Sequence, residues 1–519
     1  MGMLSREWRR LGIYPPDMVF TTDTFFDPNN AANQASIAAE AVVIRRRMTP
    51  EFIANVGNVL RPLWSTPTTT TTLDRFVVKY GLRRCHAHHV DGWIHVATMS
   101  RAKHIALDFT VGGDITSEDN KYIFPLCKLG GPNGSSVESL DLANVCLEVP
   151  APGFLGISNL KELKLHAVPI NGEVLQCLLL GSVLLERLTI KNCLFSSLCT
   201  LHSAIRNLKE LSLSSVYSIN GEGLRCLLLG CALLESLSIE TIHCLKGFSI
   251  RQELRRLKYL KVCMCQLKSI ELHAPNLTTF VLDDPLPQIV FTGSPMLLEA
   301  TFALRRKLTG LDEYIDDPFD YTLGELPTIV PHVHKLLLHM SVEAKERRFT
   351  TSHTGFINLR HLNLNLFMYV NKNYTSCVVG LVNLLELAPL LEELELHMDY
   401  FLWNSDPTLR TVTATAGHPH RHLKSVYMTG FHAVVALAEF ALYILENATV
   451  LERMVVDPVV RIKLNAIHDF YSTIKGGSNS NQEKHTPTGC YKQERNDKIR
   501  MFIKEHLLRE EFRHALTIL

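Results

Sequence analysis

The chain has 519 residues, 46% of them hydrophobic and 20% charged, which is typical of a folded protein and excludes a mostly disordered one. Its 53 Lys and Arg residues against 52 Asp and Glu give a net charge of +1. This balance excludes a protein that binds nucleic acid through an overall positive charge. At roughly 150 residues per domain, the length alone predicts three or four domains.

Cellular location is indicated by what the sequence lacks. No stretch reaches the ~18 uninterrupted apolar residues that a membrane span needs. Residues Met1 to Leu11 carry charged side chains where a secretory signal would be apolar. The 13 cysteines have no framework spacing, which is typical of thiols in a reducing compartment. We therefore expect an intracellular protein, in the cytoplasm or the nucleus, with no membrane and no nucleic acid among its partners.

Two elements are expected before the first repeat. Leu4, Trp8 and Leu11 are spaced i, i+4, i+7, so they share one face of a predicted helix that packs against the repeats as an N-terminal cap. Thr66–Thr72 is a run of threonines around one proline and predicts a flexible loop.

Two segments of the chain repeat one another. Asn159–Leu165 returns as Asn207–Leu213, and Ile170–Glu173 returns as Ile219–Glu222, at offsets of 48 and 49 residues. Each unit holds two short apolar alternations, and successive alternations start 23 to 26 residues apart. This period lies within the ~20–29 residues of leucine-rich repeats.

The alternations predict strands. Two apolar residues separated by one residue point to the same side of an extended strand, so both enter the core while the residue between them faces outward. Alternations start at Leu140, Leu163, Leu188, Leu211, Leu237, Leu260, Ile270, Phe280, Leu336, Leu362, Leu394, Val426 and Met454. One unit cannot bury its own apolar side, whereas about ten stacked units build a continuous core along a parallel sheet.

Short helices are predicted between strands, at Val174–Leu180 and Leu224–Gly230. The predicted fold is therefore α/β, a leucine-rich-repeat solenoid with a parallel sheet on its concave face. Short helices and loops cover its convex face, and a helical cap closes its N-terminal end.

Outward residues between the core leucines are candidates for binding a partner. They are Lys164, Thr189, Ser212, Ser238, Lys261, Glu271, Asn363 and Glu395. Their mixed charge suits a protein or peptide rather than a phosphate backbone, although each alone is also explained as a solvated strand residue. Binding energy concentrates in few residues, often aromatic or Arg, so further candidates are Tyr259, Tyr427, Phe367 and Arg360.

Motifs of the common enzyme classes are absent from the sequence: it contains no phosphate-binding glycine loop, no His-Glu-x-x-His and no Gly-x-Ser-x-Gly. The histidines of His86–His89 and His418–His422 lack the four spaced ligands of a closed zinc site. Cys263 and Cys265 are expected to share a strand face and to pack together in the core. We expect no catalytic residue, metal or cofactor, and a protein that is not an enzyme.

The end of the chain contains a polar segment and then an apolar pattern. Residues 476–497 are rich in Gly, Ser and Asn and predict a disordered linker. After them, Ile499, Phe502 and Ile503 recur at helical spacing, which predicts an amphipathic helix that caps the last repeat.

Three parts of the chain resemble the plant F-box/leucine-rich-repeat proteins that end in an FBD-type domain. Leu4–Leu11 (LSREWRRL) is similar to the segment that closes their F-box, and Asp17–Phe20 to the strand after it. His89–Ala97 (HVDGWIHVA) resembles the helix before their first repeat. Within His422–Pro458, HLKSVYMTGF and ILENATVLERMVVDP resemble their closing FBD pattern.

The resemblance implies a substrate-recognition subunit of an SCF-type (Skp1-cullin-F-box) E3 ubiquitin ligase. In such a ligase the F-box docks a Skp1-like adaptor and the repeats hold an unknown protein substrate. Because further F-box helices precede the segment at Leu4 in that family, Leu4, Trp8 and Leu11 are the expected remnant of the adaptor-binding surface. We expect docking to be weakened or lost. The alternative is a stand-alone repeat protein that binds a partner without a ligase.

The expected organisation is one stack of repeats with end caps rather than several globular domains. Its parts are an F-box remnant and following strand (1–26), an N-terminal cap region with the Thr-rich loop (27–104), the leucine-rich-repeat solenoid (105–400), FBD-like terminal repeats (401–475), a disordered linker (476–497) and a C-terminal amphipathic helix (498–519).

Overall fold

The computed structural model describes residues 16–26, 38–65, 72–110, 118–129, 135–148, 157–170, 172–194, 205–217, 219–247, 249–284, 287–292, 296–304, 318–343, 354–369, 375–401, 419–431, 435–461 and 489–519. The chain divides into two compact units, Met1–Pro275 (unit 1) and Asn276–Leu519 (unit 2). The helix face of Leu4, Trp8 and Leu11, the Thr-rich loop up to residue 71 and the linker up to residue 488 lie outside the described residues.

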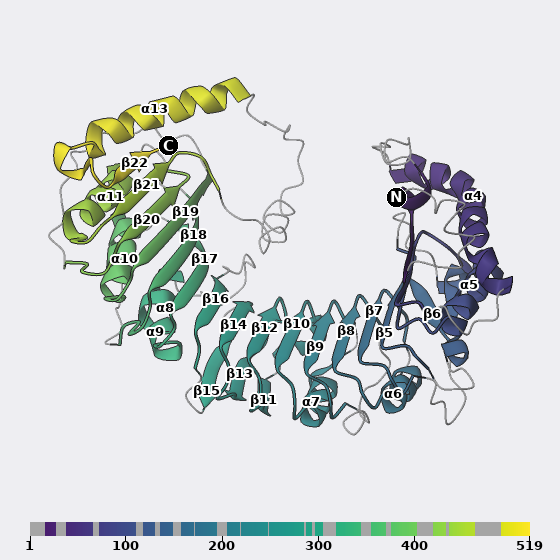
Figure 1. The fold of residues 1–519 in the computed structure, drawn as a ribbon. Helices are drawn as coiled ribbons and strands as arrows, with labels where there is room; N and C mark the ends of the chain where they lie inside the picture. The colour runs from purple at the N-terminus through teal and green to yellow at the C-terminus, as the bar shows by residue number, and fades with distance from the viewer. Residues whose placement is uncertain are drawn as a thin grey trace. The chain divides into compact units, whose positions relative to one another are not determined.

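Unit 1 is built from short strands separated by helices or loops (Figure 1). Its strands are β1 Asp17–Thr21, β2 Arg75–Lys79, β3 His104–Asp108, β4 Tyr122–Phe124, β5 Ser139–Ala143, β6 Val145–Leu147, β7 Glu162–His166, β8 Arg187–Lys191, β9 Glu210–Ser214, β10 Ser236–Glu240, β11 Ser249–Glu253, β12 Tyr259–Cys263 and β13 Ser269–His273. Its α-helices are α2 Thr22–Phe25, α4 Ala38–Ser65, α5 Ala87–Met99, α6 Gly172–Gly181 and α7 Gly221–Gly230. Its short 3-10 helices are η1 Arg84–His86, η2 Glu118–Asn120, η3 Leu126–Leu129 and η4 His243–Leu245.

The main sheet of unit 1 is parallel throughout. Its paired strands follow the order β1, β2, β3, β5, β7, β8, β9, β10, β12, and each strand aligns with the next residue for residue. The predicted Leu-x-Leu pairs are buried in every repeat, as Leu163 and Leu165 are in β7. Burying one such side chain contributes about 1.5–3 kcal/mol, so the stacked leucines are the main source of stability.

A left-handed backbone residue ends each strand from β5 to β12 of this sheet. Positive φ angles of 51° to 57° occur directly after the strands, at Asn144, Ala167, Asn192, Ser215, Thr241 and Met264. The backbone N–H of Ala167 donates to the carbonyl of Lys191, the last residue of the next strand, at 2.9 Å, and the neighbouring repeats copy this bond. The following residue then turns into the core. A non-glycine residue in this region costs about 1 kcal/mol, so repeat packing imposes the turn.

The same turn corrects the prediction for the cysteine pair. Cys263 ends β12 at an outward position and is half-buried, whereas Cys265 follows the turn at Met264 and is fully buried. The two thiols therefore do not share a face, because strand alternation stops at Cys263.

A ladder of alternating charge, which sequence reasoning missed, lines the start of the strands in unit 1. The residue before each strand is, in sheet order, Asp74, Lys103, Glu138, Lys161, Glu186, Lys209, Glu235 and Lys258. Ion pairs join them two by two, with N···O distances of 2.8, 2.8, 2.8 and 2.7 Å. The hydrogen bond from Lys209, together with its charge, lowers the pKa of Glu186, although burial acts in the opposite direction. Because like charges would repel at this spacing, the alternation favours one order of stacking.

The sheet begins before residue 105, where the repeats were expected to start. β1 confirms the expected strand at Asp17–Phe20, α5 confirms the helix at His89–Ala97, and β2 and β3 join β1 to β5. The region 27–104 therefore adds strands to the sheet. The outward positions Val77 and Ala106 are apolar and buried, so β2 and β3 read as continuous apolar runs rather than alternations.

The helices between strands confirm the prediction for the duplicated units. α6 and α7 occupy equivalent places in the two copies, and their leucines are buried at helical spacing, as Leu224, Leu227 and Leu228 are in α7. Asn220 caps α7, because its side-chain oxygen accepts a hydrogen bond from the Gly223 N–H at 2.9 Å.

Unit 2 contains the three longest strands of the described chain, β17, β18 and β19, each of nine residues (Figure 1). Its strands are β14 Thr279–Asp283, β15 Gln288–Thr292, β16 Glu299–Leu304, β17 Lys335–Glu343, β18 His361–Tyr369, β19 Glu393–Phe401, β20 Ser425–Thr429, β21 Arg453–Asp457 and β22 Leu516–Ile518. Its helices are α8 Pro318–Gly324, α9 Leu326–Ile329, α10 Thr375–Glu386, α11 Val435–Asn447, α13 Gly489–Leu507 and the 3-10 helix η6 Glu510–Phe512. Strands β14, β16, β17, β18, β19, β20, β21 and β22 pair in that order, all parallel.

The C-terminal segment differs in length from the prediction. α13 begins at Gly489, inside the segment expected as linker, and ends at Leu507. Ile499, Ile503 and Leu507 are buried, as an amphipathic helix requires. After the helix, β22 adds to β21, so the segment extends the sheet as well as covering it.

Candidate partner-binding face

Five of the predicted binding residues form one row across the main sheet of unit 1. Strand register pairs Lys164 with Thr189, Thr189 with Ser212, Ser212 with Ser238, and Ser238 with Lys261. All five are partly exposed, while the residues on either side of each are buried. The side of the sheet that carries this row is called the outer face.

Glu271 does not belong to this row, so its predicted place is wrong. It lies on β13, which pairs with β11 in a second sheet, and its carboxylate contacts Arg251 at 3.0 Å. β12 and β13 start only 10 residues apart, at 259 and 269, too close for successive repeats. Each repeat here contains two strands, and the second leaves the main sheet.

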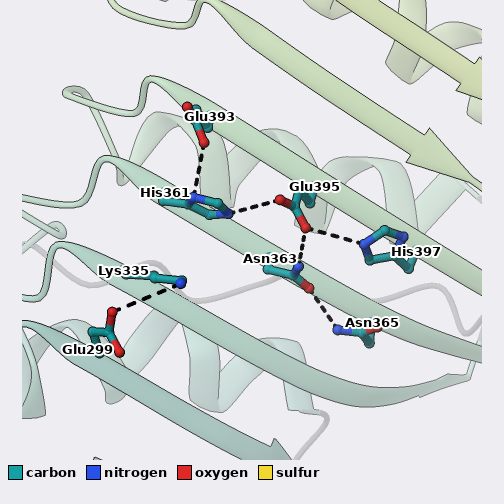
Figure 2. A network of polar contacts seen from close by, with 8 residues as sticks. All are labelled: Glu299, Lys335, His361, Asn363, Asn365, Glu393, Glu395 and His397. Carbon is teal, nitrogen blue, oxygen red and sulfur yellow. Dashed lines mark hydrogen bonds and ion pairs between the residues drawn. The ribbon is translucent and has the colours of Figure 1, made fainter. Parts of the chain in front are cut away.

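Asn363 and Glu395 form a corresponding pair in unit 2. They are register partners on β18 and β19, and the Asn363 amide donates to the Glu395 carboxylate. Figure 2 shows both within a larger polar network on β16 to β19. The outer-face row of unit 2 continues from Glu395 to Tyr427 and Val455.

Two histidines that sequence reasoning missed complete this network (Figure 2). His361 lies between two carboxylates, with Nδ1 3.1 Å from Glu393 and Nε2 3.3 Å from Glu395. His397 lies on the other side of Glu395 at 3.5 Å and shares a 2.8 Å hydrogen bond with Thr429. Both histidines flank a Leu-x-Leu pair, two residues from the outward residue between the leucines. Their position directly before or after a Leu-x-Leu pair is the sequence signal that could have identified them as residues of the outer face.

A tighter network lies on β5 to β8 in unit 1. Glu162 accepts a hydrogen bond from the Ser139 hydroxyl at 2.8 Å and pairs with Lys164 at 2.9 Å and Arg187 at 3.2 Å. Burial alone would raise the pKa of Glu162, but these hydrogen bonds and the charge of Lys164 lower it to about 2. Ser139 also shares a 2.8 Å hydrogen bond with His104, whose pKa burial lowers. Lys164 is thus held by Glu162 and has less freedom to bind a partner.

The four further candidates, chosen because aromatic residues and Arg often contribute most of the binding energy, differ in exposure. Tyr259 and Tyr427 are half-buried at outward positions of β12 and β20, and the Tyr427 ring packs edge-to-face on His397 with centroids 5.9 Å apart. Phe367 is largely buried. Arg360 precedes β18 and pairs with Glu392, which also binds Lys424 at 2.9 Å. Tyr259 and Tyr427 are therefore the better exposed aromatic candidates.

The adaptor-binding candidates Leu4, Trp8 and Leu11 lie outside the described residues. Among the described residues, no group of three or more His, Cys, Asp or Glu side chains is arranged to hold a metal ion. His420 is buried and shares a 2.9 Å hydrogen bond with the Tyr443 hydroxyl. No helix in the described part of the chain is long and apolar enough to cross a membrane.

Parallel strands that repeat at this period, with paired inward leucines and helices packed beside the sheet, define a leucine-rich-repeat scaffold, a class that binds other proteins. The model of the At1g61320/AtMIF1 LRR domain matches residues 69–202 and 188–485, which together cover more than half of the chain. The chain belongs to this family, whose name places it among plant leucine-rich-repeat proteins. A search of curated proteins finds no match.

Proposed function

We propose that this protein is the substrate-recognition subunit of an SCF-type E3 ubiquitin ligase, and that it binds its protein substrate on the outer face. The observation that carries the binding part is the register row from Lys164 to Lys261, which aligns polar side chains of five strands on a rigid sheet. A rigid scaffold loses little entropy when a partner binds. The ligase part is supported by the resemblance of Leu4–Leu11 and His422–Pro458 to F-box and FBD segments.

In this role the chain holds a protein substrate and needs neither a catalytic residue nor a cofactor of its own. The outer face combines both charges, and several of them are already paired, as Lys261 is with Glu240 at 2.9 Å. Such a surface selects a partner by the position of its charges rather than by total charge. We place this role in the cytoplasm or the nucleus.

Adaptor binding tests the ligase part. The full chain is used to recover a purified Skp1-like adaptor, beside a variant in which Leu4, Trp8 and Leu11 are all replaced by Ala. If this chain acts in the ligase, the expected result is weak recovery of the adaptor by the chain and its loss in this variant, because the three residues share one predicted helix face. The matched control replaces Arg6 and Arg9 by Ala and should retain the adaptor.

No adaptor recovery from the unaltered chain would refute the ligase role for this polypeptide. The alternative, a stand-alone repeat protein that binds a partner without a ligase, would then be favoured, since the outer face is independent of the adaptor segment.

A further inference from the structure

Strands β9 and β10 carry small hydroxyl side chains on the outer face of unit 1. They present Ser212, Ser214, Ser236 and Ser238 at outward positions, with Glu210 at the start of β9 and Glu240 at the end of β10. The strands on either side carry longer side chains: β8 has Arg187 and Lys191, and β12 has Tyr259 and Lys261. Three strand spacings separate β8 from β12, about 14 Å in all. This width accepts an extended chain or one helix of a partner.

Several outward polar side chains of β8 and β9 have no partner among the described residues. Within the described part of the chain, no hydrogen bond or ion pair is formed by the side chains of Thr189, Lys191, Ser212 and Ser214. Glu162, one strand before β8, is by contrast saturated by three donors. Unused hydrogen-bonding capacity on β8 and β9 therefore includes Lys191 and three hydroxyl groups near it in the sheet.

Two exposed apolar side chains lie at the same edge of the sheet. Leu194 and Tyr217 follow β8 and β9, pair with each other in a parallel bridge and are 52% and 50% exposed. The N–H of Tyr217 donates to the carbonyl of Cys193 at 3.0 Å, which fixes the two backbones side by side. The equivalent positions of neighbouring repeats carry no large exposed apolar side chain: they are Cys146, Pro169, His243 and Gln266. An exposed Tyr beside an aliphatic residue is a typical anchor of a protein interface.

The charges around this edge set the chemistry of the partner. Lys191 is an exposed cation without an ion pair in the described residues. The nearest outward carboxylate in its register row on the β9 side is Glu240, two strands away, and Lys261 and Ser238 already bind it at 2.9 and 2.8 Å. Glu210, an exposed carboxylate, lies at the opposite end of β9, four residues before Ser214. A carboxylate from outside therefore meets one uncompensated positive charge and several free hydroxyl donors.

We propose that the edge formed by Thr189, Lys191, Leu194, Ser212, Ser214 and Tyr217 binds a segment of the substrate protein that carries an acidic side chain next to an apolar one. The carboxylate pairs with Lys191 and accepts hydrogen bonds from Ser212 or Ser214. The apolar side chain packs on Leu194 and Tyr217. This proposal rests on the proposed protein-binding function and does not depend on the ligase.

The test uses a phage-displayed library of random short peptides, selected on the full chain. Enriched peptides are expected to share an Asp or Glu beside an aliphatic or aromatic residue. Synthetic versions of them should bind Lys191→Glu and Tyr217→Ser variants about tenfold more weakly, because each change removes one half of the contact. Replacing the acidic residue of the peptide by Lys should restore binding to the Lys191→Glu variant.

Lys79→Glu is the matched control. Lys79 occupies the same register row on β2, is exposed and, like Lys191, makes no ion pair within the described residues. Binding to this variant should stay unchanged. Thermal unfolding of each variant shows whether it folds, and all of the changed side chains are exposed.

Two results would overturn the proposal: enriched peptides without an acidic residue, or peptides that bind Lys191→Glu as well as they bind the unaltered chain. The second result would leave protein binding in place and move the site elsewhere. A chain that binds these peptides but recovers no adaptor would instead refute only the ligase role.

Discussion

Strands end differently in the repeats of unit 1 and among the long strands of unit 2. In the main sheet of unit 1, the strands β5, β7, β8, β9, β10 and β12 each stop after five residues at a left-handed residue such as Thr241. In unit 2, β17, β18 and β19 continue for nine residues. Unit 2 also buries a row of polar side chains at the fifth position of β18 to β21, two of which, β20 and β21, are themselves five residues long.

That row shows what the difference means for function. Asn365, His397, Thr429 and Asp457 are register neighbours on β18 to β21 and are all buried. Their polar groups bind one another or nearby residues, as His397 binds Thr429, and so they stabilise the unit. In unit 1 the fifth residues of β8 and β9, Lys191 and Ser214, are accessible. The fifth position is therefore available for recognition on these two strands, whereas in unit 2 it is used in internal polar contacts.

The largest expected effect concerns the residue after β20. Gly430 has φ +66°, and a Cβ there would lie 1.9 Å from the Met398 carbonyl oxygen. Gly430→Ala should lower the free energy of unfolding by about 2–4 kcal/mol, since strain and overlap add. Urea denaturation followed by circular dichroism measures it. Gly57→Ala, a change on a helix where a Cβ meets nothing within 4 Å, is the control and should stabilise by about 0.5–1 kcal/mol. An equal response of the two variants would contradict the expected difference.

The second effect concerns the carboxylate network of unit 1. Glu162→Gln should cost about 1–2 kcal/mol at neutral pH, because Lys164, Arg187 and Ser139 all bind the charged form. The folded pKa of about 2 lies below the usual value of 4.5, so this stabilisation is present above pH 4.5 and is lost as the pH falls towards 2.

The matched variant is Glu210→Gln, in the same register row but exposed and without a partner among the described residues. It should change stability by less than about 0.5 kcal/mol. Urea denaturation between pH 2 and 7 compares the free energy of unfolding of the two variants. Identical pH profiles would show that the contribution of Glu162 to stability does not come from its ion pairs and hydrogen bonds.

The third effect tests the left-handed turns of unit 1. Thr241 is β-branched and has φ 54°, a region that Asn tolerates better. Thr241→Asn should therefore raise the free energy of unfolding by about 0.5–1 kcal/mol. Thr189→Asn, on a regular strand, should leave it unchanged or lower it. A loss of stability in Thr241→Asn would mean that the side-chain contacts of Thr241 matter more for stability at this position than its left-handed backbone conformation.

The smallest effect concerns the charge ladder. Lys209→Glu places a negative charge between Glu186 and Glu235, and its ion pair with Glu186 at 2.8 Å is lost. The free energy of unfolding should fall by about 0.5 kcal/mol at low ionic strength. This decrease should be smaller in high salt, because exposed charges are screened. Melting temperatures at low and high salt concentration measure this. A loss that is independent of salt would show that packing, and not charge, is responsible.

Much of the fold could be predicted from local pattern. Every Leu-x-Leu alternation in the described residues became a strand, because a period of two matches the pleat of a strand whatever surrounds it. β2 and β3 were missed because their outward residues, Val77 and Ala106, are also apolar and buried. These strands therefore show no alternation of apolar and polar residues. β13 was misplaced because alternation identifies a strand but not the sheet that it joins.

The candidate site was predictable only in part. The row from Lys164 to Lys261 follows from the repeat period, which brings equivalent positions into register. The partners of each side chain do not follow from it. Glu162 binds Ser139 and Arg187, which lie 23 and 25 residues away in the chain on the two neighbouring strands, whereas Glu210 in the same register row has no partner among the described residues.

The sequence by itself thus determined the class of protein: a repeat scaffold whose outward residues form rows, because periodicity is a local property of the chain. The tertiary structure decided which rows are accessible, which charges are already paired, and that Leu194 and Tyr217 lie exposed and paired after the ends of β8 and β9. Those features depend on stacking, since each repeat completes the hydrogen bonds and covers the side chains of the next.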